Sequence, residues 1–227
     1  MHSYLQPLVT LLENHADAAK AAPMARYMRD QFPFLGIKSP ERKTLFRQFI
    51  AESGLPQLQD LEAAVWDLWQ LPEREYQYCA QDLLHRMRKQ IRPDFVPLLE
   101  RLITTKSWWD TVDGLASHAV GGLFTRYPDV REPTVARWRN SDNFWLRRTT
   151  LLFQLGYKDK TDEALLLALI EENLDSDEFF IQKAIGWVLR EYSKTAPNVV
   201  QRYVALTTLA PLSEREALKW MKKKGML

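Results

Sequence analysis

The stretch SWWDTVD (residues 107–113) reads as the start of a helix, and its spacing from similar stretches decides the fold. A serine followed three residues later by an acidic residue is similar to a capping box, which satisfies N–H groups of a first helical turn. Comparable openings recur at intervals of 32, 36, 34, 35 and 37 residues, near Ser39, Leu71, Ser107, Ser141, Ser176 and Ser213. A period of about 35 residues is typical of an α-solenoid, in which each repeat is one helix pair.

The segments between these openings carry the pattern of amphipathic helices. Residues 57–69 place apolar side chains on one face, and the segment from Ser39 to about Gly54 begins with proline in its first turn. Residues 213–216 (SERE) have the pattern of a full capping box. No segment shows the alternation and turn residues of a β-hairpin. We therefore expect an all-α protein of roughly twelve helices, built as a right-handed α-solenoid of HEAT-like helix pairs with a concave groove.

The composition indicates a single folded domain over residues 1–227 and excludes several classes of protein. A hydrophobic fraction of 46% with 11% aromatic residues is too high for a disordered chain. No window reaches the ~18 apolar residues of a membrane span, and residues 1–20 lack the features of a signal peptide. The one cysteine, Cys79, fits a reducing cytoplasm. Because the four histidines are scattered without ligand spacing, we expect no metal site. We also expect no cofactor and a monomeric protein.

The charge balance is close to neutral, with 31 basic and 29 acidic residues and a net charge of +2. This total is modest for a nucleic-acid-binding protein, but the distribution of charge can matter more than the sum. Residues 86–92 hold four cations and no acid, and residues 137–148 and 222–224 are also basic. Each of these runs also fits a solvated helix face, so charge alone does not decide between the two interpretations.

The repeat period places residues of different helices in equivalent positions. Steps of 35 residues lead from Asp113 to Arg148 and then to Lys183. Trp109 lies one helical turn before Asp113 and therefore on the same face. An acid, an aromatic ring and cations along one surface favour a binding groove, although the aromatic residues could instead belong to the core.

The sequence resembles the HEAT-like-repeat alkylpurine DNA glycosylases, the AlkD family of DNA alkylation repair enzymes. The most specific matches are SWWDTVD (107–113), SDNFWLRRTTLLFQLGYK (141–158) and EFFIQKAIGWVLREYSKT (178–195). The resemblance continues through PMARYMRDQFPFLGIKSPERK (23–43), LWQLPEREYQ (68–77) and LAPLSEREALK (209–219), and so covers essentially the whole chain.

The resemblance implies a role for individual residues. Asp113 matches the catalytic aspartate, and Trp109 and Trp187 match the two tryptophans that contact the deoxyribose. Arg148 matches an arginine that contacts the DNA backbone, and Tyr27 matches a tyrosine that reaches the duplex. Lys38, in the loop before the third helix, stands where the family has a glutamine and is a further expected DNA contact. The equivalent positions 35 residues apart and the resemblance together also predict that Lys183 and Arg190 contact DNA.

The implied activity is hydrolysis of the N-glycosidic bond of 3-methyladenine and 7-methylguanine in duplex DNA, without base flipping, leaving an abasic site for base excision repair. A purine alkylated at N3 or N7 is cationic and leaves as a neutral base, so no general acid is needed and one carboxylate can suffice. A non-catalytic solenoid that binds damaged or branched DNA remains the alternative, and a protein-binding scaffold is a third possibility. Lys183 keeps a Schiff-base lyase activity open.

Overall fold

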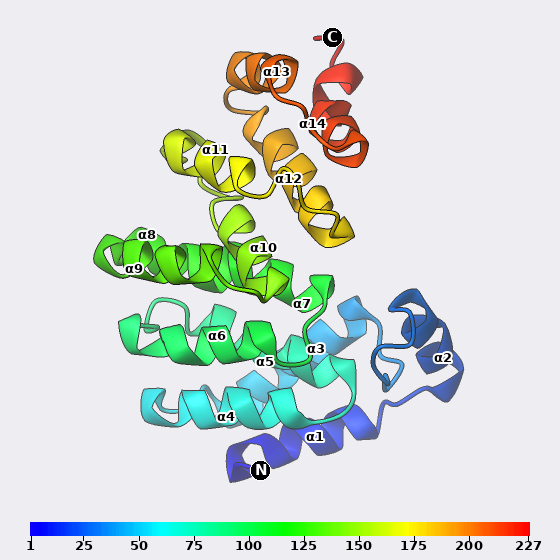
Figure 1. The fold of residues 1–227 in the computed structure, drawn as a ribbon. Helices are drawn as coiled ribbons and strands as arrows, with labels where there is room; N and C mark the ends of the chain where they lie inside the picture. The colour runs from blue at the N-terminus through cyan, green and yellow to red at the C-terminus, as the bar shows by residue number, and fades with distance from the viewer. The chain divides into compact units, whose positions relative to one another are not determined.

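The computed structural model describes residues 1–227 and contains helices but no strands (Figure 1). There are fourteen α-helices, where the sequence predicts roughly twelve. In chain order they are α1 (Gln6–Glu13), α2 (Ala18–Tyr27), α3 (Ser39–Ser53), α4 (Leu58–Gln70), α5 (Arg74–Arg86), α6 (Val96–Thr104), α7 (Trp109–Gly114), α8 (Gly121–Arg126), α9 (Pro128–Arg139), α10 (Phe144–Leu152), α11 (Glu163–Glu171), α12 (Phe179–Tyr192), α13 (Pro197–Leu206) and α14 (Pro211–Lys223).

Short helical turns complete the list of elements. Three of them are 3₁₀ turns, and the fourth is a π-helical turn that directly follows α7. Their bounds are η1 (Ser3–Leu5), η2 (Pro93–Phe95), η3 (Leu115–Val120, the π turn) and η4 (Lys158–Lys160). None of the helices combines the length and the apolar character needed to cross a bilayer.

The 35-residue period predicted from the sequence is present in the helix starts. Five helices begin at positions 39, 74, 109, 144 and 179, so that each start follows the previous one by 35 residues. These helices are α3, α5, α7, α10 and α12. The prediction of an all-helical repeat fold is therefore confirmed, and the equivalence of Asp113, Arg148 and Lys183 follows, because each is the fifth residue of its helix.

Two of the predicted helix caps are wrong. Ser107 donates its hydroxyl to the carbonyl of Ile103, and α7 begins two residues later behind Trp108. Ser213 lies inside α14 and donates to the carbonyl of Gln182 on α12, so it is not an N-cap. These serines follow the helix period but donate to neighbouring carbonyls. A hydroxyl can either accept from an N–H group of a first helical turn or donate to a carbonyl.

The chain forms two compact units, Met1–Leu98 and Leu99–Leu227. In the first unit, a motif in α5 holds the loop that precedes α3. The buried carboxylate of Glu75 accepts hydrogen bonds from the backbone N–H groups of Leu35, Gly36 and Ile37, at 3.0, 2.9 and 3.0 Å. Gly36 has a φ of +92°, and a Cβ there would lie 2.0 Å from the carbonyl oxygen of Asp17, so this position requires glycine.

Neighbouring residues of the same motif contact the same loop and the end of α4. The guanidinium of Arg74 lies 3.8 Å from the ring centroid of Phe32, and the Arg74 backbone N–H donates to the Pro33 carbonyl at 2.9 Å. The side-chain amide of Gln77 donates to the carbonyl of Leu71 at 2.8 Å at the end of α4. The segment EREYQ (73–77) thus fixes the loop that ends at Lys38, one of the predicted DNA contacts.

Replacing Glu75 with glutamine should destabilise the protein by about 2 kcal/mol, because an amide nitrogen replaces one of the two oxygens that accept buried backbone N–H groups. The measurement is the free energy of unfolding from urea denaturation. Glu73→Gln is the matched control, since it removes the same charge from the same motif at a partly exposed position, and we expect a change within about 0.5 kcal/mol. Equal stability of the two variants would contradict this role of Glu75.

In the second unit, α10 packs on α7, α9, α11 and α12, and α12 packs on α13 and α14 (Figure 1). Gly186 of α12 lies against α14, where a Cβ would come within 2.6 Å of the Glu216 Cβ and 2.8 Å of the Ser213 carbonyl oxygen. Only glycine allows this approach, and the hydrogen bond from Ser213 to Gln182, at 2.9 Å, holds the helices in register. The close contact brings side chains of α14 to the candidate site on α12.

Candidate active site

Six of the eight predicted site residues line one cavity of about 360 Å³ in the second unit. They come from the first two turns of α7 and α10 and from three successive turns of α12. The complete lining is Trp109, Asp113, Arg148, Phe179, Phe180, Lys183, Trp187, Arg190 and Glu216. The structure therefore brings these six residues together and adds two phenylalanines and a second carboxylate to the lining.

The carboxylate of Asp113 is held by the guanidinium of Arg148. The Nε of Arg148 donates to Oδ1 and its Nη2 donates to Oδ2, both at 2.8 Å, which is a bidentate pair. The Nη1 of Arg148 donates to the carbonyl of Phe180, which fixes the guanidinium from the other side. Both side chains are largely buried, with exposed fractions of 4% for Arg148 and 13% for Asp113. This geometry fixes the orientation of the Asp113 carboxylate in the cavity.

Two opposing effects set the pKa of Asp113. Burial raises the pKa above the ordinary value, because the charged form loses its hydration. The hydrogen bonds and positive charge of Arg148 lower it, and the nearby charge of Asp110 raises it. The net direction is upward, so the ionised form of Asp113 depends on Arg148.

Two indole rings and two phenylalanines provide the aromatic part of the lining. Trp109 is the first residue of α7, Trp187 lies in the third turn of α12, and both are partly exposed. Phe179, the first residue of α12, is 47% exposed and packs edge-on against Phe180, with a distance of 5.3 Å between the ring centroids. Phe144, the equivalent residue of α10, stacks on Phe180 instead and does not line the cavity.

A second carboxylate lies between two cations of α12. Glu216 of α14 accepts from the Nζ of Lys183 at 3.2 Å and from the Nη1 of Arg190 at 2.6 Å. Burial would raise the pKa of Glu216, but Lys183, Lys219 and Arg190 outweigh it, so the pKa lies below its ordinary value. Glu216 is therefore ionised wherever an ordinary glutamate is.

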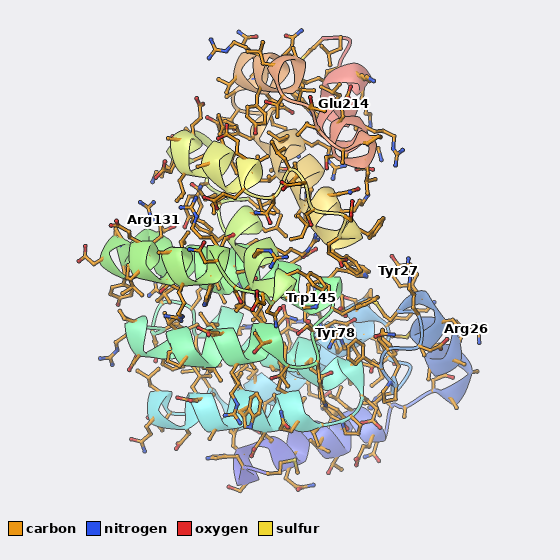
Figure 2. All side chains as sticks on the ribbon, viewed as in Figure 1. Arg26, Tyr27, Tyr78, Arg131, Trp145 and Glu214 are labelled. Carbon is orange, nitrogen blue, oxygen red and sulfur yellow. The ribbon has the colours of Figure 1, made fainter.

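The remaining predicted residues, Tyr27 and Lys38, belong to the first unit. Both line a cavity of about 480 Å³ bounded by α2, α3 and α5. Tyr27, labelled in Figure 2 at the end of α2, is 72% exposed, and Lys38 is exposed just before α3. Their contact with DNA stays a prediction.

Sequence reasoning missed Glu216 and the pairing of Arg148 with Asp113. Glu216 has the position expected of the acid in a capping box, which concealed its approach to α12. The signal that could have revealed it is Gly186, because a glycine inside a helix often marks close packing. No group of three or more His, Cys, Asp or Glu side chains could hold a metal ion.

Comparison with known proteins shows the family to which the chain belongs. Residues 8–221 match the family described as DNA alkylation repair enzyme. A structure from Enterococcus faecalis, described as a predicted DNA alkylation repair enzyme, is 37% identical, with a TM-score of 0.84 over 92% of this chain and 97% of that one. AlkD2 from Streptococcus mutans shares the fold at 14% identity, with a TM-score of 0.59 over 78% of this chain and 87% of that one. No curated protein matches the chain.

Proposed function

Because this chain belongs to the DNA alkylation repair enzyme family, we propose that it is a monofunctional DNA glycosylase that releases cationic N3- and N7-alkylated purines from duplex DNA. The observation that carries the proposal is the Asp113 carboxylate, which Arg148 holds in a cavity with the indoles of Trp109 and Trp187. We further propose that both compact units act as one DNA-repair domain, since the family match extends over both.

The proposed reaction breaks the bond between C1′ of deoxyribose and N9 of a purine that is alkylated at N3 or N7. The electron pair of this bond goes to the base, which leaves neutral, and positive charge develops on the sugar. An ionised Asp113 stabilises that charge and accepts a hydrogen bond from the water that attacks C1′. Once the water oxygen has bonded to C1′, its extra proton passes to Asp113 and from there to solvent. Arg148 occupies one acceptor direction on each carboxylate oxygen, so further lone pairs are available for this water.

The indoles of Trp109 and Trp187 suit a cationic nucleotide. Their electron-rich faces attract positive charge, by about 0.5–2 kcal/mol for each ring. The attraction applies to the alkylated nucleotide before bond cleavage and to the cationic sugar during it. An uncharged nucleotide gains less from the same surface, which favours damaged over normal DNA.

The second carboxylate does not supply a general acid. Glu216 has a lowered pKa and gives both oxygens to cations, so it has no proton to donate to a leaving base. Lys183 is paired with Glu216 as an ammonium ion, whereas a Schiff-base nucleophile is an unprotonated amine. These two observations support hydrolysis by water, with an abasic site as the product, over a lyase reaction.

Selectivity then depends on the charge of the lesion. The cavity lining contains no asparagine or glutamine that would read the edge of a flipped base. We therefore propose that the enzyme engages the sugar and backbone without flipping the base. The alternative, a non-catalytic protein that binds damaged or branched DNA, accounts less well for a buried carboxylate oriented by an arginine.

A panel of lesions in one duplex sequence tests this selectivity. We expect a larger N3- or N7-alkyl adduct to be released within roughly tenfold of the methyl adduct, a window of about 1.4 kcal/mol. Hypoxanthine and ethenoadenine should remain near background, because their departure needs a proton that no residue beside Asp113 supplies. The measurement is the single-turnover excision rate for each lesion. Efficient release of hypoxanthine would contradict the mechanism.

A further inference from the structure

Glu216 shares the candidate cavity with two cations that flank Trp187 on α12. Lys183 lies four residues before Trp187 and Arg190 three residues after it, so all three share one face of the helix. The Glu216 carboxylate bridges the cations, at 3.2 Å from the Lys183 Nζ and 2.6 Å from the Arg190 Nη1. The exposed fractions are 37% for Lys183, 25% for Arg190 and 13% for Glu216. The acid is therefore the most enclosed member of the cluster.

The packing of α12 on α14 builds this arrangement into the fold. Gly186 removes the side chain that would meet the Glu216 Cβ, and Ser213 bonds to the carbonyl of Gln182 one turn earlier on α12. Glu216 thus enters between Lys183 and Arg190 from a neighbouring helix. A surface salt bridge formed by two flexible side chains would have no such support.

We propose that Glu216 is a specificity-determining residue that limits the attraction of Lys183 and Arg190 for the phosphates of undamaged DNA. The inference rests on the proposed DNA-binding function and adds a residue that opposes binding. Two cations and one carboxylate leave a net charge of +1 in the cluster, where the cations alone would give +2. A DNA phosphate that approaches Lys183 or Arg190 must share the cation with a carboxylate already bound to it.

The charge of Glu216 acts in opposite directions on DNA phosphates and on a cationic lesion. The negative charge of Glu216 repels phosphate groups but attracts a cationic purine or a cationic sugar. Its presence therefore weakens the binding of undamaged duplex more than the binding of duplex with a charged lesion. A repair enzyme encounters a large excess of undamaged DNA. Weaker non-specific binding therefore improves discrimination of damaged from undamaged DNA.

The test is the variant Glu216→Gln, measured by binding of an undamaged duplex over a range of salt concentrations. Removing the charge should release one cation for a phosphate, which steepens the slope of log K against log salt by about 0.9. Between roughly 50 and 200 mM salt, the variant should lose about threefold more affinity than the wild type. In an Asp113→Asn background, which slows excision, Glu216→Gln should raise affinity for undamaged duplex more than for duplex with 7-methylguanine.

Two matched variants distinguish the steeper salt slope expected for Glu216→Gln from a change in the protein's net charge and from a loss of folding. Glu191→Gln removes the same charge from α12, at a pair with Lys194 (2.5 Å) outside the Asp113 cavity, and should keep the wild-type slope. Lys183→Gln combined with Glu216→Gln returns the cluster to +1 and should restore that slope. If Glu216 only holds α14 in place, Glu216→Gln would lower the melting temperature and weaken binding without a steeper slope. That result, or equal slopes for Glu216→Gln and Glu191→Gln, would overturn the proposal.

Excision of 7-methylguanine by the wild type, measured separately, keeps this inference distinct from the proposed function. Excision with unchanged slopes in Glu216→Gln would refute the role of Glu216 alone. The expected slopes without any excision would refute the glycosylase activity and leave the role of Glu216 in DNA binding intact.

Discussion

Replacing Asp113 with asparagine is expected to slow the release of 7-methylguanine from duplex DNA roughly 10- to 1,000-fold, or about 1.4–4 kcal/mol. Asparagine keeps the size of the side chain but removes the negative charge that stabilises the cationic sugar. The measurement is single-turnover excision with enzyme in excess, and DNA affinity should change little. The amide also loses one acceptor for Arg148, so the variant's melting temperature must be measured alongside.

Asp110→Asn is the matched control for this variant, because it removes the same charge from the same helix outside the cavity lining. Asp110 raises the pKa of Asp113, so its removal favours the ionised form of Asp113 and should not slow excision. A wild-type rate in Asp113→Asn would exclude Asp113 as the catalytic group.

The second large effect is expected for Arg148→Ala. This change leaves the Asp113 carboxylate buried without the guanidinium, and breaking such a pair destabilises a protein by roughly 3–5 kcal/mol. Arg148 lowers the pKa of Asp113, so in the variant that pKa should rise further above its ordinary value. Asp113 then becomes ionised only at higher pH, and the acidic limb of the pH–rate profile should move to higher pH.

The sign of the stability change with pH follows from the same shift. A carboxyl group whose pKa is higher in the folded than in the unfolded state binds more protons when folded, so its ionisation opposes folding. The destabilisation by Arg148→Ala should therefore be smaller at acidic pH, where Asp113 is protonated, and larger as the pH rises through the pKa of the folded state. Urea unfolding at several pH values measures this dependence.

Arg147→Ala serves as the control for Arg148, since Arg147 is adjacent on α10 and donates instead to the carbonyl of Ser141 at 2.6 Å. It should leave the pH–rate profile unchanged. If Arg148 acts only on DNA phosphates, as the resemblance alone would suggest, its removal would make the salt dependence of binding shallower by about one unit with no pH shift. An unchanged pH profile would thus refute the positioning role.

The helical repeat could be predicted from the sequence because it depends on spacing. Helix starts 35 residues apart determine which residues are equivalent, and this placed Asp113, Arg148 and Lys183 on successive repeat helices. The exact starts were less predictable, since Ser107 and Ser213 bond to carbonyl groups rather than to the N–H groups of a first turn.

The partners of the charged site residues could not be predicted in the same way. Equivalent positions on neighbouring helices indicate proximity, but not whether Arg148 turns toward Asp113 or toward DNA. Glu216 reaches the site only because Gly186 allows α14 to approach α12, which is a property of tertiary packing. Glu75 likewise acts on a loop about 40 residues away in the sequence.

The most direct test of the proposed glycosylase activity is the release of 7-methylguanine from a duplex with one such base, by the wild-type protein in excess. We expect release well above spontaneous depurination, with an abasic site that remains uncut until it is treated with alkali. Release no faster than spontaneous loss, by a protein that binds the same duplex, would contradict this activity and favour the non-catalytic alternative.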